Sequence, residues 1–97
     1  MTIESAIFLD RDNTLTVDEG YTSDPNKFAW VKGAPDALKL FNDLSLPVFV
    51  FTNQGGIGRG FFTEQDMQNF NNKLIHETRK IGGDILDIAF CPHHPLS

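Results

Sequence analysis

Residues 7–14, which decide the fold, read Ile-Phe-Leu-Asp-Arg-Asp-Asn-Thr. The apolar run predicts a β-strand, and it leads directly into two aspartates spaced two residues apart. Because side chains alternate along an extended backbone, Asp10 and Asp12 are expected to leave the strand end on the same side. Paired carboxylates suit a divalent cation and a phosphoryl group: one attacks phosphorus while the other moves a proton, with the Thr14 hydroxyl nearby. The alternative is an acidic loop in which Asp10 only caps a turn.

A second apolar segment ends in a glycine-rich loop, since residues 48–60 read Val-Phe-Val-Phe-Thr-Asn-Gln-Gly-Gly-Ile-Gly-Arg-Gly. Glycines let backbone N–H groups approach an anion closely, and the Thr52 hydroxyl adds a donor. The loop is not a Walker A motif, because Phe61 stands where lysine is required, and the same residue breaks the dinucleotide-binding glycine pattern. The segment therefore predicts an anion-binding loop of another kind, with a surface loop without a ligand as the alternative.

The spacing of apolar residues predicts alternating strands and helices. We expect strands over residues 5–9, 46–51 and 85–90, a helix from Pro35 to about residue 44, and a second helix that starts with a cap at residues 63–66 and ends at Gly82 and Gly83. Residues 10–33 are loop-rich, with a small hairpin near residues 15–21. The second helix is expected to bury an inner stripe made of Met67, Phe70, Leu74, Ile75 and Thr78.

The βαβαβ order predicts an α/β fold with parallel strands and right-handed crossovers. The strand over residues 46–51 is apolar on both faces, as is typical of a buried parallel strand. In open α/β sheets, ligands bind beyond the carboxyl ends of the strands. Asp10, Thr52 and Cys91 each come just after a predicted strand, so we expect all three motifs at one edge of the sheet.

Length and composition limit the classes of function. The chain has 97 residues, which is at most one domain, and 40% hydrophobic residues, which is enough for a core. A net charge of −5 argues against a broad basic face for nucleic acid or an anionic membrane. One cysteine permits no internal disulfide and suits a reducing compartment. No apolar run is long enough to span a membrane and no signal peptide is evident, so we expect a cytoplasmic protein.

Together the two motifs resemble motifs I and II of the haloacid dehalogenase-like (HAD) phosphatases, namely Asp-x-Asp-x-Thr after the first strand and a threonine after the second. Residues 52–60 are similar to the subgroup that holds the heptose bisphosphate and histidinol-phosphate phosphatases. Residues 18–21 (Asp-Glu-Gly-Tyr) and 91–95 (Cys-Pro-His-His-Pro) favour the heptose enzymes, because they resemble that group's substrate loop and the first half of its zinc site. The resemblance implies an HAD-like Rossmannoid parallel sheet with a minimal cap.

Two positions depart from the pattern of the family. Asn13 replaces the usual glycine after the second aspartate, and Gly55 replaces the usual serine. Asparagine tolerates a positive φ better than most residues, so the first change is expected to be mild. The second change removes a hydroxyl from the vicinity of the phosphate.

The resemblance implies roles for the site residues. Asp10 is the nucleophile that forms an aspartyl-phosphate, Asp12 is the general acid and base, and Thr52 hydrogen-bonds the phosphoryl oxygens. Mg²⁺ is bound by the Asp10 side chain and the Asp12 backbone carbonyl and neutralises phosphate charge. The expected substrate-binding residues are Arg11, Asp18, Glu19, Gly20, Tyr21, Asn53, Gln54, Gly55 and Arg59. Strand alternation points Arg11 away from the aspartates, so we expect it to contact substrate or lie at the surface; Arg59 either reaches a second phosphate or is solvated.

Cys91 and His93 have a spacing compatible with zinc. A closed structural zinc site needs four ligands, and the resemblance places the other two in a Cys-x-Cys further along the chain, beyond Ser97. Zinc is therefore expected only at a partial site. The alternative is a buried apolar cysteine with two loop histidines, His93 and His94.

The sequence thus predicts a Mg²⁺-dependent phosphatase that, by resemblance, removes the 7-phosphate of a heptose bisphosphate. Histidinol-phosphate phosphatase, DNA 3′-phosphatase and a non-catalytic phosphate-binding module are the alternatives. The family's third motif, a lysine, and its fourth, an aspartate, are absent from residues 1–97, so we expect the chain to be the N-terminal part of a single phosphatase domain. The activity of this part alone stays open. Members of the family are monomers, and self-association of the fragment is an alternative.

Overall fold

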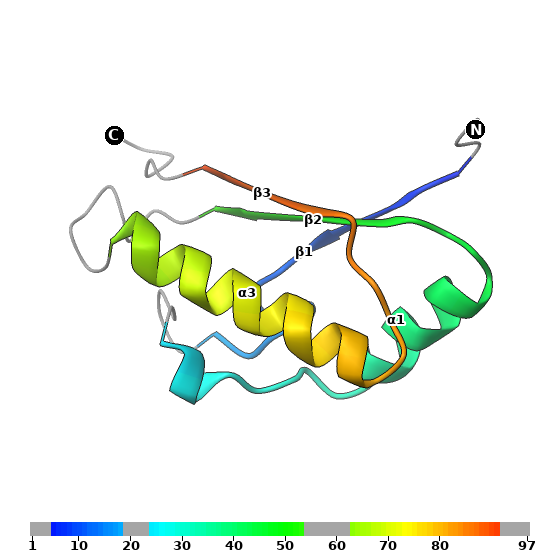
Figure 1. Ribbon diagram of the computed structural model, residues 1–97, viewed down its shortest axis with the longest axis horizontal. Coiled ribbons are helices and arrows are strands. Elements are labelled where there is room, and N and C mark those ends of the chain that lie inside the picture. The colour runs from blue at the N-terminus through cyan, green and yellow to red at the C-terminus, as the bar shows by residue number, and fades with distance from the viewer. Residues whose placement is uncertain (1–4, 19–23, 54–62, 92–97) are drawn as a thin grey trace.

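The computed structural model describes residues 5–18, 24–53 and 63–91, and within them three strands form one parallel sheet (Figure 1). The strands are β1 (Ile7–Asp10), β2 (Val48–Asn53) and β3 (Asp87–Cys91), in the spatial order β1-β2-β3. A 3₁₀-helix, η1 (Pro25–Lys27), and helix α1 (Ala34–Asp43) connect β1 to β2, and helix α3 (Glu64–Lys80) lies between β2 and β3. All strand pairs are parallel, which confirms the predicted α/β fold.

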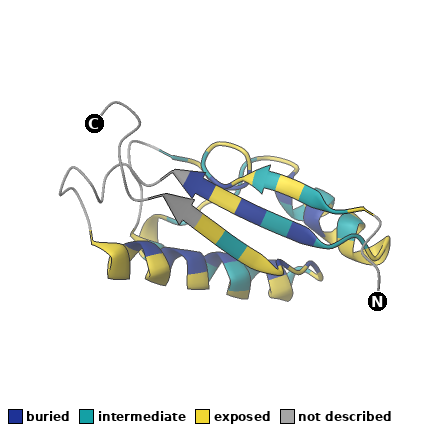
Figure 2. Cartoon of the chain, turned by 90° about the horizontal axis from the view of Figure 1, so that it is seen from above, coloured by how far each residue is buried: buried dark blue, intermediate teal, exposed yellow. Residues whose placement is uncertain are grey.

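Both helices lie on one face of the sheet, and the other face is bare among the described residues (Figures 1 and 2). The core lies between this covered face and the helices and contains Leu15, Ala34, Leu38, Val48, Val50, Leu74 and Ile85. On the open face Phe8 and Phe51 are 68% and 51% exposed. The prediction that β2 is buried on both faces is therefore wrong for this chain, because the described residues contain no helix that packs on the second face.

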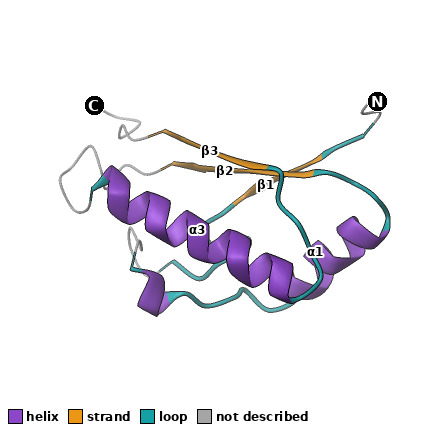
Figure 3. Cartoon of the chain, in the orientation of Figure 1, coloured by secondary structure: helices purple, strands orange, loops and turns teal. Residues whose placement is uncertain are grey.

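Helix α3 starts and ends as its sequence predicts (Figure 3). The Thr63 side chain accepts a hydrogen bond from the backbone of Asp66, whose carboxylate accepts one in return from the Thr63 N–H, so a capping box is formed. After the helix, Gly82 has a φ of +88°. A Cβ at Gly83 would lie 3.1 Å from Cβ of Leu38, so this glycine allows the chain to pass close to α1.

The inner stripe of α3 differs from the prediction at two places. Met67, Phe70, Leu74 and Thr78 are buried as expected, whereas Ile75 is only half-buried. Asn71, which the prediction omitted, is 8% exposed. A polar side chain therefore lies among the apolar residues that face the core.

No helix in the described part of the chain is long and apolar enough to cross a membrane.

In the loop between β1 and α1, residues 15–17 pair with residues 29–31, whereas the far part of the hairpin predicted near residues 15–21 lies outside the described residues. Thr16 forms an antiparallel bridge with Trp30, flanked by hydrogen bonds from the Val17 N–H to the Ala29 carbonyl and from the Val31 N–H to the Leu15 carbonyl. The sequence analysis did not predict this pairing of residues 15–17 with residues 29–31. Local spacing could not reveal this partner, because the pairing joins residues on either side of a 3₁₀-helix.

Candidate active site

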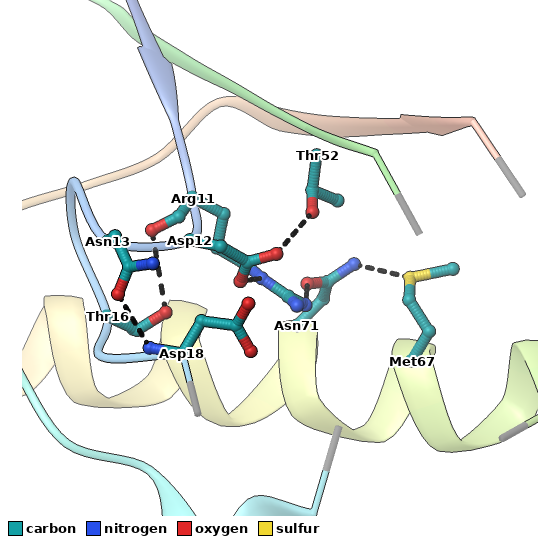
Figure 4. A network of polar contacts seen from close by, with 8 residues as sticks. All are labelled: Arg11, Asp12, Asn13, Thr16, Asp18, Thr52, Met67 and Asn71. Atoms are coloured by element: carbon teal, nitrogen blue, oxygen red, sulfur yellow. Dashed lines mark hydrogen bonds and ion pairs between the residues drawn. The ribbon is translucent and has the colours of Figure 1, made fainter. Parts of the chain in front are cut away.

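The carboxyl ends of β1, β2 and β3 bring the predicted motifs to one edge of the sheet. Asp10 is aligned with Phe51, and Asn53 is aligned with Cys91. Thr52 is 3% exposed, and its Oγ1 donates a hydrogen bond to Oδ2 of Asp12 at 3.3 Å (Figure 4). The predicted meeting of the first two motifs is thus confirmed.

The two aspartates occupy different environments, because the chain bends at the end of β1. The strand ends at Asp10, which is exposed. Asp12 belongs to the following turn, where its side chain is 21% exposed. The backbone of Asp12 forms an isolated parallel bridge with that of Thr16. The alternation argument that placed both carboxylates on one side therefore does not extend to Asp12, since that argument requires extended backbone.

The turn that carries Asp12 is tied together by its own backbone. The N–H groups of Leu15 and Thr16 both donate to the carbonyl of Arg11, and the Asn13 N–H donates to the carbonyl of Thr16. Asn13 has a φ of 60°, which supports the expectation that asparagine takes the place of a glycine here with little strain. Its Oδ1 also accepts a hydrogen bond from the Asp18 N–H at 2.9 Å, a contact that glycine would lack.

Arg11 contradicts the prediction made for it. Its side chain is fully buried, and its Nε lies 2.7 Å from Oδ1 of Asp12. Its Nη1 donates to Oδ1 of Asn71 at 2.9 Å, and its guanidinium carbon lies 4.6 Å from the centroid of the Phe70 ring. Arg11 therefore points toward Asp12 and α3, and the expected surface position is wrong. A contact with substrate would require this side chain to become accessible.

Sequence reasoning missed Asn71, although a signal was present. Asn71 follows Met67 by four residues and Phe70 by one, so it falls on the inner stripe of α3. A polar residue at such a position needs a buried partner. The residue that supplies it is Arg11, sixty positions earlier in the chain.

Several predicted site residues lie outside the described part of the chain, namely Glu19, Gly20, Tyr21, Gln54, Gly55, Arg59 and His93. Asp18 is half-buried at the end of the turn after β1. Asn53 and Cys91 end their strands at the site edge. Within the described residues no group of three or more His, Cys, Asp and Glu side chains could hold a metal ion. Asp10 and Asp12 alone therefore do not complete a cation site.

Comparison with known proteins fits this geometry. Residues 5–93 match the model of a family described as polynucleotide kinase 3 phosphatase. The chain belongs to this family. The match includes both aspartates, Thr52 and the whole of the described sheet.

Curated relatives carry a more specific name. The chain is 39% identical over 90 residues to a D-glycero-beta-D-manno-heptose-1,7-bisphosphate 7-phosphatase of Yersinia pestis, a match that covers 93% of this chain and 48% of the relative. It is 38% identical over 90 residues to the protein of the same name from Escherichia coli K12, covering 93% of this chain and 47% of that one. The chain thus spans about half the length of the curated relatives it matches.

Solved structures share the fold. The D,D-heptose 1,7-bisphosphate phosphatase of B. bronchiseptica, complexed with magnesium and phosphate, superposes with a TM-score of 0.86 at 27% identity, over 94% of this chain and 51% of that one. A HAD-like phosphatase from Mesorhizobium loti superposes with a TM-score of 0.87 at 34% identity, over 93% and 43% of the two chains. The sheet and helices are therefore those of a HAD-like phosphatase, and this chain corresponds to about half of such a protein.

Proposed function

We propose that this chain is the N-terminal part of a Mg²⁺-dependent sugar-phosphate phosphatase that removes the 7-phosphate of a heptose 1,7-bisphosphate. The observation that carries the proposal is the arrangement at the carboxyl edge of the sheet. There Asp12 is held by the Thr52 hydroxyl in the turn that follows the exposed Asp10. The names of the relatives supply the substrate class.

The two environments suit two different roles. Asp10 is exposed and can reach a ligand, so its carboxylate oxygen attacks phosphorus and the bond to the sugar oxygen breaks. Asp12, in its protonated form, gives its proton to the leaving sugar oxygen, then takes a proton from the water that attacks the aspartyl-phosphate. That second attack releases inorganic phosphate and restores the Asp10 carboxylate. Thr52 lies next to this path, and its single hydroxyl proton, which the Asp12 carboxylate accepts here, would have to turn to a phosphoryl oxygen to hydrogen-bond the substrate.

Hard oxygen ligands at this edge fit Mg²⁺. The exposed Asp10 carboxylate is one such ligand, and the backbone carbonyl of Asp12 is the second that the family resemblance implies. The Asp12 side chain is already bound to Arg11 and Thr52, which agrees with a backbone role in metal binding. When bound, the cation would neutralise charge on the phosphate. Zinc at Cys91 and His93 is proposed only as two ligands of a tetrahedral set.

Substrate choice is assigned to segments beside this edge. We assign it to residues 18–21, together with Asn53, Gln54, Gly55 and Arg59. The location of Asp18 at the end of the turn after β1 supports this, because its N–H donates a hydrogen bond to Oδ1 of Asn13, the residue that follows Asp12. Placement in the cytoplasm is part of the same proposal, since a single cysteine suits a reducing compartment.

A DNA 3′-phosphatase is the second candidate, and the description of the family favours it. The net charge of −5 opposes it, because a surface that binds a polyanion is normally basic. The test is a completed domain, in which this chain is joined to the second half of the Yersinia pestis relative. Phosphate release is measured with heptose bisphosphate, histidinol phosphate and a 3′-phosphorylated oligonucleotide. We expect the highest kcat/KM for the heptose; a comparable kcat/KM for the oligonucleotide would reject the sugar assignment.

A further inference from the structure

We propose that Arg11 and Asn71 act as a positioning pair that fixes the carboxylate of Asp12 for its proton transfers; this inference rests on the proposed function. The pair lies behind Asp12, on the side of α3 (Figure 4). Neither residue is assigned a reacting atom. Their role is to hold the carboxylate in one orientation.

Both oxygens of the Asp12 carboxylate accept hydrogen bonds from buried residues. Oδ1 accepts from Nε of Arg11 at 2.7 Å, and Oδ2 accepts from Oγ1 of Thr52 at 3.3 Å. The two donors come from different segments, the turn after β1 and the end of β2. Rotation of the carboxylate about its terminal bond would break both contacts. A fixed orientation of this kind is what a proton transfer needs, because small displacements of a catalytic group reduce the rate strongly.

Arg11 can hold Asp12 only if Arg11 itself is held. Its guanidinium is fully buried, packs over the Phe70 ring at 4.6 Å and donates through Nη1 to Asn71. The planar guanidinium donates through Nε to Asp12 in the turn and through Nη1 to Asn71 on α3. Because these nitrogens are held in one rigid plane, Arg11 fixes the distance between the Asp12 turn and α3. An arginine without these partners would be a buried charge at high cost in free energy.

Asn71 is in turn oriented by its own helix. Its Nδ2 donates to Sδ of Met67 at 2.7 Å, which leaves Oδ1 directed at Arg11. Asparagine is a weak helix former and rarely suits an apolar stripe, so neither helix propensity nor core packing accounts for it here. The hydrogen bond that Asn71 accepts from Arg11 accounts for an asparagine at this position. The contacts run continuously from Met67 through Asn71 and Arg11 to Asp12.

The first test compares two neighbouring asparagines of α3. Asn71→Leu removes the acceptor for Arg11 but keeps a side chain of similar size, and Asn72→Leu changes an exposed residue on the same turn. In the completed domain we expect Asn71→Leu to lower kcat about tenfold, with KM for the sugar phosphate within about twofold of the parent. Asn72→Leu is expected to leave both unchanged. Equal kcat in the two variants would overturn the positioning role.

The second test separates position from charge. Arg11→Lys keeps the positive charge, but a single ammonium cannot reach Asp12 and Asn71 in the same fork, so we expect its kcat to fall nearly as far as that of Arg11→Met. Full activity in Arg11→Lys would show that charge alone matters and would reject the pair. All rates are measured well below the unfolding midpoint and divided by the folded fraction. A loss that vanishes after this correction would mean a structural role only.

A readout independent of turnover uses the 97-residue chain itself. Hydrogen exchange of the Arg11 Nε–H, followed by NMR, should be slow in the parent and in Asn72→Leu, and at least tenfold faster in Asn71→Leu. Unchanged exchange in Asn71→Leu would overturn the inference even if the enzyme is active. If the completed domain released no phosphate from any substrate, the proposed function would be rejected. If the parent domain were active and Asn71→Leu were equally active, only the positioning role would be rejected.

Discussion

The two faces of the sheet differ sharply in what covers them. On the covered face Val48 and Val50 are 1% and 2% exposed beneath the helices, whereas Phe8 and Phe51 on the open face are 68% and 51% exposed (Figure 2). Phe8 stacks on Phe49, with ring centroids 5.4 Å apart, so the open face carries an aromatic surface. Parallel sheets normally bury both faces. Within the described residues, packing is therefore complete on one side of this sheet only.

The same division separates the two aspartates. Phe8 and Asp10 alternate along β1 with the half-buried Leu9, and the next residue, Arg11, is buried on the helix side. Asp10 thus lies with the open face, while Asp12 is tied to buried groups on the covered side. Asp10 and Asp12, for which we propose the roles of nucleophile and proton carrier, therefore differ in accessibility although they are only two residues apart.

Asp10→Asn should abolish phosphate release in the completed domain while the fold survives. The amide keeps the shape of the side chain but is a poor nucleophile. Turnover and the unfolding midpoint are measured together, with Asp43→Asn as the control, because Asp43 is an exposed carboxylate that forms an exposed ion pair with Lys39. Retention of more than about a tenth of kcat, a barrier change below ~1.4 kcal/mol, would rule out Asp10 as the nucleophile.

Asp12→Asn should lower kcat on the order of 10²–10⁴-fold, because it removes general acid–base catalysis. This loss should be equal to or smaller than that of Asp10→Asn. The amide oxygen can still accept from Arg11, so the turn should keep its geometry. The check is kcat/KM, which reports the first step, with a substrate whose leaving group needs no proton, such as p-nitrophenyl phosphate, for which the loss should shrink. An equal loss for both substrates would contradict the acid role of Asp12.

Much of this architecture follows from local sequence signals. The order of strands and helices along the chain, the parallel pairing, the capping box at Thr63 and the placing of the first two motifs at one sheet edge were predicted, because apolar periodicity and parallel topology determine them. The burial of Arg11 against α3 was not predicted, because its partner Asn71 lies sixty positions further along the chain. The bare face was missed because β2 is apolar on both sides whether or not a second layer covers it.

Two neighbouring residues of β2 measure the difference between the faces. Val50→Thr places a hydroxyl in the covered core and should reduce the free energy of unfolding by about 1–3 kcal/mol. Phe51→Thr acts on the open face and should change it by less than about 1 kcal/mol. Threonine suits a strand in both cases, so strand propensity is matched. Urea unfolding of the 97-residue chain gives both values. Equal losses would show that the open face is buried in solution, for example by another copy of the chain.

The smallest effect is expected at Asn13, where the turn that carries Asp12 departs from the glycine of the family. Asn13→Gly loses the hydrogen bond to the Asp18 N–H but relieves the positive φ of 60°, so the two changes should nearly cancel, leaving a stability change within about 0.5 kcal/mol. Asn13→Ala loses the same hydrogen bond and keeps a conformation that alanine adopts poorly, so it should cost about 1 kcal/mol or more. The two variants are compared by urea unfolding of the 97-residue chain. If Asn13→Gly were as damaging as Asn13→Ala, the side-chain contact to Asp18 and not the backbone conformation would be what holds this turn in place beside Asp12.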